Sequence, residues 1–172
     1  AYYSPSKDIV VLPMKAQFNI GDSPEETYRG GMEYYSTMLH EMTHSTMTPE
    51  RLNREMGGRF GDPKYAKEEL VAELTAAMIS HSMGFDSRIT DNSAAYLDSW
   101  IGVLKQEPKF IVSVMADVNK ASDLILDHVD KQRLALGEQP YLAKNDPLTS
   151  MSADQEKSFR NAAIVKTRSG DY

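Results

Sequence analysis

The sequence predicts an α+β fold in which helices dominate and a small antiparallel β-sheet stands near the N-terminus. Several proline-free stretches carry apolar residues at spacings of three and four, which is the pattern of a helix that buries one face. Short β-favouring runs flank a polar turn at the start of the chain. With 172 residues, 41% hydrophobic and 26% charged, the chain is large enough for one domain with its own core.

A β-hairpin is the first expected element. Its strands are Tyr2–Tyr3 and Asp8–Leu12, and the segment between them, Ser4–Lys7, holds the proline and serines typical of a turn. The next segment, Lys15–Ile20, is compatible with another strand or with a loop.

A long helix is expected next. Ser23 can cap it, Pro24 suits its first position, and Glu26 completes a capping box. No proline interrupts residues 27–44, and the apolar stripe consists of Met32, Tyr35, Leu39 and Met42. The pair Gly30–Gly31 is unusual here, because a glycine inside a helix costs about 1 kcal/mol relative to alanine. Either the helix begins late, near the second glycine, or another backbone packs closely against the pair.

Further helices follow along the chain. The second runs from a cap at Asp62–Pro63 to Gly84. The third begins at Asp91 or Asn92 and ends near Gln106.

A fourth helix begins at Pro108 and completes a domain that we expect to occupy residues 1–137. Its apolar stripe consists of Phe110, Ile111, Val114, Val118, Ala121, Leu124, Ile125 and Val129. Residues 138–172 are more polar and are expected to form a tail that is partly ordered at most, with one short helix near Asp154–Val165.

The strongest functional signal is the pentapeptide His40-Glu41-Met42-Thr43-His44, an H-E-x-x-H motif. Residues four apart lie on one face of a helix, so His40 and His44 can bind one zinc ion. Glu41 lies beside the metal and can take a proton from a water molecule held there. Zinc is the expected ion, with manganese or another divalent transition metal as alternatives, because imidazole suits several of them.

A third ligand is expected on the second helix, because catalytic zinc usually has three protein ligands. Glu69 and Glu73 are four residues apart on one helix face, where like charges repel unless positive charge lies beside them. We expect Glu69 to be the ligand and Glu73 to accept a hydrogen bond from a ligand imidazole. Glu68 points about 100° away and is expected in solvent. His81 and His128 stand alone in the sequence and are weaker candidates.

The residues around the motif resemble a known family, the C-terminal zincin-like metallopeptidase domain of ArdC-type antirestriction proteins. The resemblance covers roughly residues 1–128. It rests on Asp8-Ile9-Val10-Val11-Leu12-Pro13, Tyr34-Tyr35, Phe60-Gly61 followed by Tyr65-Ala66, the run from Glu68 to Leu74, and Ser99-Trp100 followed by Leu104-Lys105.

This resemblance implies a zincin-like fold of the glutamate-ligand branch, with the small antiparallel sheet packed on the active-site helix. In the family, the metallopeptidase-like domain follows an N-terminal domain that binds single-stranded DNA. That domain is absent from this chain, which opens at Ala1 on the strand segment, so we expect a fragment of a longer protein. The family travels on plasmids and other conjugative elements and is associated with protecting incoming DNA from restriction.

Two functions are compatible with the sequence. The first is a zinc-dependent peptidase that hydrolyses a peptide bond of an unidentified protein or peptide substrate, with Glu41 as the base. The second is a catalytically silent, metal-stabilised module for protein interaction. The retention of Glu41, which is not a ligand, favours the peptidase.

The amino-acid composition limits the possible binding partners and the cellular compartment. A net charge of −6 is unfavourable for autonomous DNA binding, because phosphate contacts need clustered Lys and Arg. Any contact with single-stranded DNA is therefore expected through the absent N-terminal domain. The chain has no Cys, which excludes thiolate ligands and fits a reducing compartment. No apolar run is long enough to span a membrane, and the expected location is the cytoplasm.

Overall fold

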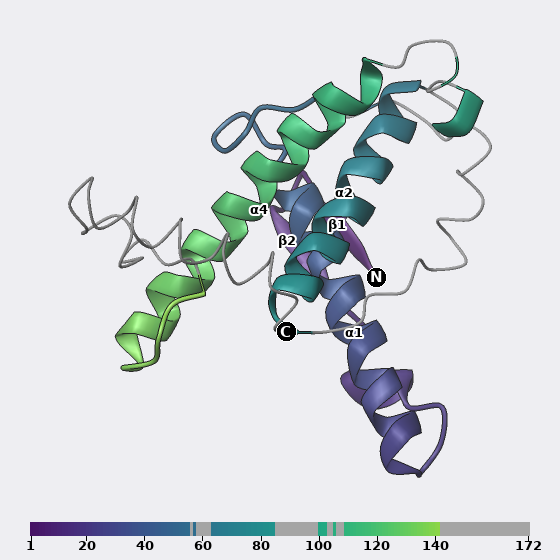
Figure 1. Ribbon diagram of the computed structural model, residues 1–172, viewed down its shortest axis with the longest axis vertical. Helices are drawn as coiled ribbons and strands as arrows, with labels where there is room; N and C mark the ends of the chain where they lie inside the picture. The colour runs from purple at the N-terminus through teal and green to yellow at the C-terminus, as the bar shows by residue number, and fades with distance from the viewer. Residues whose placement is uncertain (56, 58–62, 85–99, 103–104, 106–108, 142–172) are drawn as a thin grey trace, which may run out of the picture. The chain divides into compact units, whose positions relative to one another are not determined.

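The structure is a computed structural model of residues 1–172, and it describes residues 1–55, 57, 63–84, 100–102, 105 and 109–141. Packing divides the chain into two parts after His128. In the first part, helices α1 and α2 lie side by side and the two strands pack on α1 (Figure 1). The expected helix-dominated α+β fold, with a small antiparallel sheet on the motif-bearing helix, is confirmed.

The N-terminal hairpin forms as predicted. Strands β1 (Tyr2–Ser4) and β2 (Ile9–Val11) pair antiparallel, with Tyr2 opposite Val11. Asp8 adopts a positive φ of 49° in the turn and accepts a 2.7 Å hydrogen bond from the Tyr3 hydroxyl. The following segment is neither the strand nor the loop we expected, because residues Lys15–Phe18 form a short 3-10 helix, η1.

Helix α1 runs from Pro24 to Ser45 and carries the H-E-x-x-H motif in its last turns. The capping box is present, since Glu26 N–H donates to Ser23 Oγ and Ser23 N–H donates to the Glu26 carboxylate, both at 3.2 Å. The helix is continuous through both glycines. A Cβ on Gly30 would overlap the carbonyl oxygen of Phe18, so close packing of a second backbone explains this glycine.

Helix α2 (Pro63–Ser82) lies between α1 and helix α4 (Phe110–Ala135) in the core. Gly84, with a φ of +79°, follows the end of α2 as predicted. The buried cluster consists of Ala66, Leu70, Val71, Trp100, Val114 and Val118. The Trp100 indole N–H donates to the Ala66 carbonyl at 2.8 Å. Most of the expected third helix, and the cap residue Asp62, lie outside the described residues.

The segment after α1 joins the hairpin to the end of this helix. The Arg51 guanidinium donates to both oxygens of Asp8, at 2.8 and 2.7 Å, and to the carbonyl of Ser45 at 2.6 Å. These bonds hold the strands against the end of α1 that carries the motif.

The second part begins at Val129, within α4. Gly137 has a φ of +77° just after the helix, and the Arg133 guanidinium donates to the Gln139 carbonyl at 2.6 Å. The expected domain end at residue 137 stays a prediction, and the short helix near Asp154–Val165 lies outside the described residues. Among the described helices, none is both long and apolar enough to cross a membrane.

Candidate metal centre

The two motif histidines lie on one face of α1, one turn apart. Their Nε2 atoms are 3.0 Å from each other, and their side chains are only 19% and 12% exposed. This arrangement follows from the i, i+4 spacing, which stacks His40 and His44 near the helix end.

Helix α2 brings the predicted third residue to the same point. Glu69 Oε2 lies 3.7 Å from His40 Nε2, and Glu69 Oε1 lies 3.5 Å from His44 Nε2. One ligand atom from each of the three residues lies within 4.8 Å of the others. Among the described residues this is the one group of three His, Asp or Glu side chains close enough to hold a metal ion.

Each imidazole is also held from behind by a second carboxylate. Glu73 Oε1 lies 3.2 Å from His40 Nδ1, and Glu68 Oε1 lies 3.3 Å from His44 Nδ1. A carboxylate is an acceptor, so each Nδ1 carries the hydrogen and donates it. An imidazole that donates from Nδ1 has, in its neutral form, its lone pair on Nε2, which here is the side where the three residues converge.

The electrostatics of the centre are dominated by this concentration of negative charge. Burial acts to lower the pKa of His40, but the hydrogen bond from His40 to Glu73 and the charges of Glu73, Glu69 and Glu41 outweigh it and raise the pKa. The charge of Glu41 thus contributes to the raised pKa of His40, the residue before it in the sequence. Its side chain is half-buried on α1.

Glu68 is where the sequence-based expectation was wrong. We expected Glu68 in solvent, but it is only 4% exposed. Burial acts to raise the pKa of Glu68, but hydrogen bonds from Arg54 and His44 lower it below the ordinary value. The reason is that α2 is buried round most of its circumference, so a rotation of about 100° from Glu69 leads to another interior face and not to water.

Arg54 was missed altogether. Its guanidinium donates from Nε to Glu68 Oε2 at 2.9 Å and from Nη2 to Glu68 Oε1 at 2.7 Å. The sequence contains no periodic signal for this residue, because it lies in an irregular segment after α1. The one hint in the sequence was Glu68, a glutamate close to Glu69 and Glu73 for which we expected no role in the site.

The two remaining histidines do not join the cluster. His81 is exposed near the end of α2. His128 is exposed on α4, and its Nδ1 is 2.8 Å from the carbonyl of Leu124 in the preceding turn. The structure therefore separates the motif pair from both weaker candidates.

A match to a known protein family agrees with this geometry. The sequence model of a family described as zincin-like metallopeptidase matches residues 1–117. The chain belongs to the zincin-like metallopeptidase family.

Curated relatives extend the match beyond the family model. DNA primase TraC of Escherichia coli is 34% identical over 157 residues, which cover 91% of this chain and 14% of the primase. The uncharacterized protein y4eC of Sinorhizobium fredii (strain NBRC 101917 / NGR234) is 32% identical over 123 residues, or 72% of this chain and 37% of that protein. The chain therefore spans well under half the length of these two relatives.

Solved structures confirm the resemblance to ArdC-type proteins. The antirestriction protein ArdC from plasmid R388, in its Mn(II)-bound form, is 36% identical with a TM-score of 0.58, over 74% of this chain and 43% of that chain. Its metal-free form is also 36% identical, with a TM-score of 0.56 over 81% and 44%. The zincin-like fold is thus supported by both sequence and structure.

Proposed function

We propose that this domain binds one divalent transition-metal ion through His40 Nε2, His44 Nε2 and a carboxylate oxygen of Glu69, with zinc as the expected ion. The observation that carries the proposal is the orientation of the two imidazoles. Their Nδ1 atoms face Glu73 and Glu68, so the two Nε2 atoms lie 3.0 Å apart on the side of Glu69. When both imidazoles are neutral, the two Nε2 lone pairs and the Glu69 carboxylate together offer three ligand atoms to one cation.

The spacing of the donor atoms fits such an ion. Tetrahedral ligands about 2.0–2.2 Å from zinc are about 3.3–3.6 Å from one another. The observed separations are near this range, at 3.0 Å between the two nitrogens, 3.7 Å from His40 Nε2 to Glu69 Oε2 and 3.5 Å from His44 Nε2 to the other oxygen, Oε1. The relative ArdC, 36% identical, is known in an Mn(II)-bound form, which supports a divalent ion without selecting zinc.

We further infer that this centre hydrolyses a peptide bond. A bound divalent ion supplies Lewis-acid chemistry, polarising a carbonyl and lowering the pKa of a bound water towards ~7. The carboxylate of Glu41 accepts a proton from the attacking water as the water oxygen bonds to the carbonyl carbon. Glu41 then donates this proton to the nitrogen of the leaving amine as the C–N bond breaks. Membership of a metallopeptidase family and a glutamate beside the ligands support this role.

One observation favours a second candidate, a metal-stabilised module for protein interaction. The proposed ligands come from two helices, α1 and α2, so a bound ion would also join these helices. In that case the metal would matter for stability, and Glu41 would have no chemical task.

The first experiment tests the ion and its ligands. Purified protein should contain about one equivalent of metal or take it up on addition. His40→Ala and Glu69→Ala should bind it far more weakly, while His128→Ala, which changes an exposed histidine outside the cluster, should bind it normally. Protein that neither contains nor takes up any divalent ion would end the proposal.

The second experiment separates the two functions. Glu41→Gln should keep the metal and the fold, yet lower cleavage of a broad peptide library by about 10²–10⁴-fold. Glu33→Gln, an exposed position two turns earlier on α1, is the matched control and should cleave normally. If the wild type loads metal but cleaves nothing in the library, and Glu41→Gln behaves like the wild type, the interaction module is the better account.

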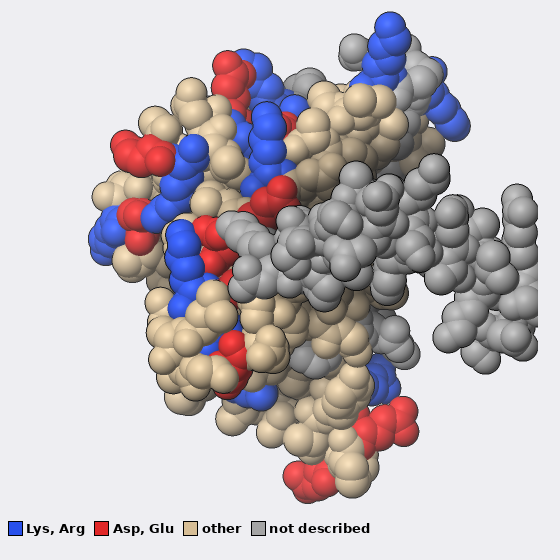
Figure 2. Space-filling view, turned by 60° about the vertical axis from the view of Figure 1, so that its left-hand side comes forward, with Lys and Arg blue, Asp and Glu red and all other residues tan. Residues whose placement is uncertain are grey.

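We also propose that this domain serves an antirestriction role on a mobile element, with single-stranded DNA bound outside the domain. The ArdC relative supports this context, and the chain covers 43% of its length. The surface seen in Figure 2 interleaves Lys and Arg with Asp and Glu on this face, which is not the single-sign field that phosphate binding requires.

A further inference from the structure

Arg54 is nearly buried, with a side chain that is 7% exposed, and it joins the two helices of the metal centre. On one side its guanidinium forms two parallel bonds to Glu68 of α2, at 2.9 and 2.7 Å. On the other side it donates to the Thr43 carbonyl at 3.0 Å and to Thr46 Oγ1 at 2.8 Å, at the end of α1. The residue therefore spans from the helix that carries the histidines to the carboxylate behind one of them.

The distances indicate which partner sets the orientation of the carboxylate. Glu68 is held by Arg54 at 2.7 and 2.9 Å, whereas its contact with His44 Nδ1 is longer, at 3.3 Å. A guanidinium fork fixes both oxygens in one plane, which a single hydrogen bond from an imidazole cannot do. The position of Glu68 Oε1 behind His44 is thus imposed by Arg54.

We propose that Arg54 is a positioning residue of the metal centre. It fixes the carboxylate of Glu68, Glu68 holds His44 through Nδ1, and His44 thereby presents Nε2 to the ion with a fixed tautomer and ring orientation. This inference rests on the proposed function, because it assumes that His40, His44 and Glu69 bind the metal. It adds a residue that has no described hydrogen bond to a proposed ligand and whose contact with the imidazole of His44 runs through Glu68.

Stability alone does not account for this arrangement. A buried ion pair contributes little net stability compared with apolar residues of similar volume, because both charges lose their hydration. Partners of ligand imidazoles, in contrast, change metal affinity by about 10–100-fold when removed. Removing Arg54 alone leaves the buried Glu68 carboxylate unpaired and also destabilises the fold, so the inference is tested by the metal affinity of folded variants.

Arg51 provides a matched control in the same segment. It also makes a two-pronged ion pair, with Asp8, and it also donates to a carbonyl at the end of α1, that of Ser45. Its carboxylate partner is bonded to Tyr3 in the hairpin, and no described hydrogen bond joins Asp8 to a histidine. Replacing Arg51 removes a similar anchor of the segment without touching the metal centre.

The experiment measures zinc affinity by competition with a chromogenic chelator, together with the visible absorption spectrum of the Co²⁺-loaded protein. Variants are Arg54→Ala, Glu68→Ala, the double variant and Arg51→Ala. We expect Arg54→Ala to weaken zinc binding by about 10–100-fold and to change the Co²⁺ spectrum. The double variant should bind zinc no more weakly than Glu68→Ala, because Arg54 acts through Glu68. Arg51→Ala should match the wild type in both measurements.

Several results would overturn the inference. They are wild-type zinc affinity in Arg54→Ala, equal losses in Arg54→Ala and Arg51→Ala, or a loss in the double variant equal to the sum of the single losses. If Arg54→Ala does not fold, Arg54→Lys decides instead, since it keeps the charge but lacks the fork. Arg54→Lys should weaken zinc binding at a nearly unchanged melting temperature, and wild-type affinity in it would refute the role. A wild type that binds neither Zn²⁺ nor Co²⁺ would instead refute the proposed function itself.

Discussion

Gly30 and Gly31 are neighbours on α1 with opposite surroundings, which makes them a sharp test of how this helix is held. Replacing either by alanine should gain about 1 kcal/mol of helix propensity. At Gly31 the nearest atom to a new Cβ is Lys15 Cε at 3.8 Å, an ordinary contact. We therefore expect Gly31→Ala to stabilise the protein by about 1 kcal/mol.

At Gly30 the same methyl group would overlap the carbonyl oxygen of Phe18 and stand 2.9 Å from its carbonyl carbon and 3.2 Å from Asn19 Cα. These are backbone atoms, which cannot rotate away, so η1 would have to move. Overpacking of this kind costs about 1–3 kcal/mol. Because the propensity gain is common to both variants, this cost is also the expected difference between Gly30→Ala and Gly31→Ala.

The two variants should be compared by urea unfolding and by thermal unfolding, followed by circular dichroism. The expected difference corresponds to roughly 2–12 °C in melting temperature for a chain of this size. Metal affinity should not differ, because Gly30 precedes His40 by ten residues, or about 15 Å along the helix. Equal stability of the two variants would refute the close approach of the Phe18 backbone to α1.

Two further predictions concern carboxylates. Glu73→Ala should weaken metal binding by about 10–100-fold, because it removes the acceptor of His40 Nδ1, and chelator competition would measure the loss. Hydrogen bonds from Arg51 and then Tyr3 hold the pKa of Asp8 at about 2, below its usual 3.8. A lowered carboxyl pKa stabilises the fold above the unfolded value and loses this effect as pH falls. The excess stability of wild type over Asp8→Asn, measured from urea midpoints, should therefore be complete above about pH 5 and shrink between about pH 4 and pH 2. A constant excess across that range would contradict the ion pair.

The sequence predicted the features that depend on local spacing. The capping box around Ser23, the hairpin and the shared helix face of His40 and His44 all follow from residues a few positions apart, whereas Glu69 was expected at the pair because catalytic zinc needs a third ligand. What could not be predicted depends on tertiary approach.

Local sequence patterns were least informative where contact with a second segment determines the structure. The 3-10 helix at Lys15–Phe18 packs against α1, and its backbone is the reason for Gly30. Glu68 was placed in solvent because helical phase gives direction but not surroundings, and its partner Arg54 lies in another segment. The predicted apolar stripe of α1 is also unevenly buried, since Tyr35 is 37% exposed and Leu39 is 3% exposed.

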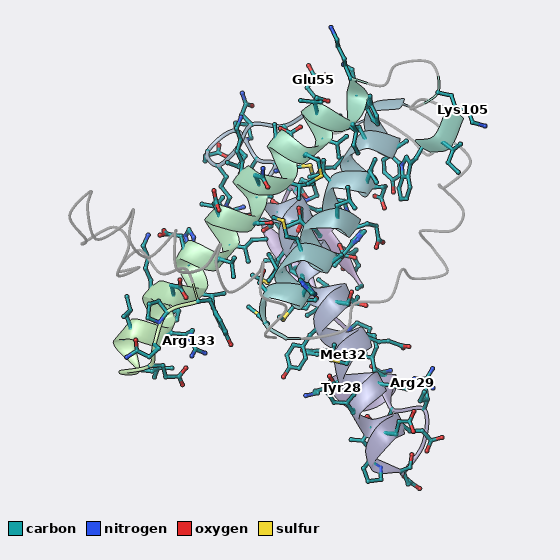
Figure 3. The ribbon with its side chains drawn as sticks, viewed as in Figure 1. Tyr28, Arg29, Met32, Glu55, Lys105 and Arg133 are labelled. Carbon is teal, nitrogen blue, oxygen red and sulfur yellow. The ribbon has the colours of Figure 1, made fainter. Side chains whose placement is uncertain are left out.

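The half of α1 that precedes the motif is more exposed than the half that carries the motif. Tyr28, Arg29 and Met32 project from this first half in Figure 3, and Tyr28 is 56% exposed. Substitutions there should leave the metal centre unaffected and are suitable positions for attaching a spectroscopic label.

The partial exposure of the metal centre has a consequence for what the protein carries in a cell. The side chains of His40, His44 and Glu69 remain 19%, 12% and 14% exposed, so water reaches them without global unfolding. An ion held there would exchange with its surroundings during the lifetime of the protein. Sites with nitrogen and oxygen ligands share one affinity order for divalent transition metals, so the supply of each metal contributes to which ion is bound. The metal found in one preparation would then reflect the metals available during growth, and a single preparation would not define the ion that the site prefers.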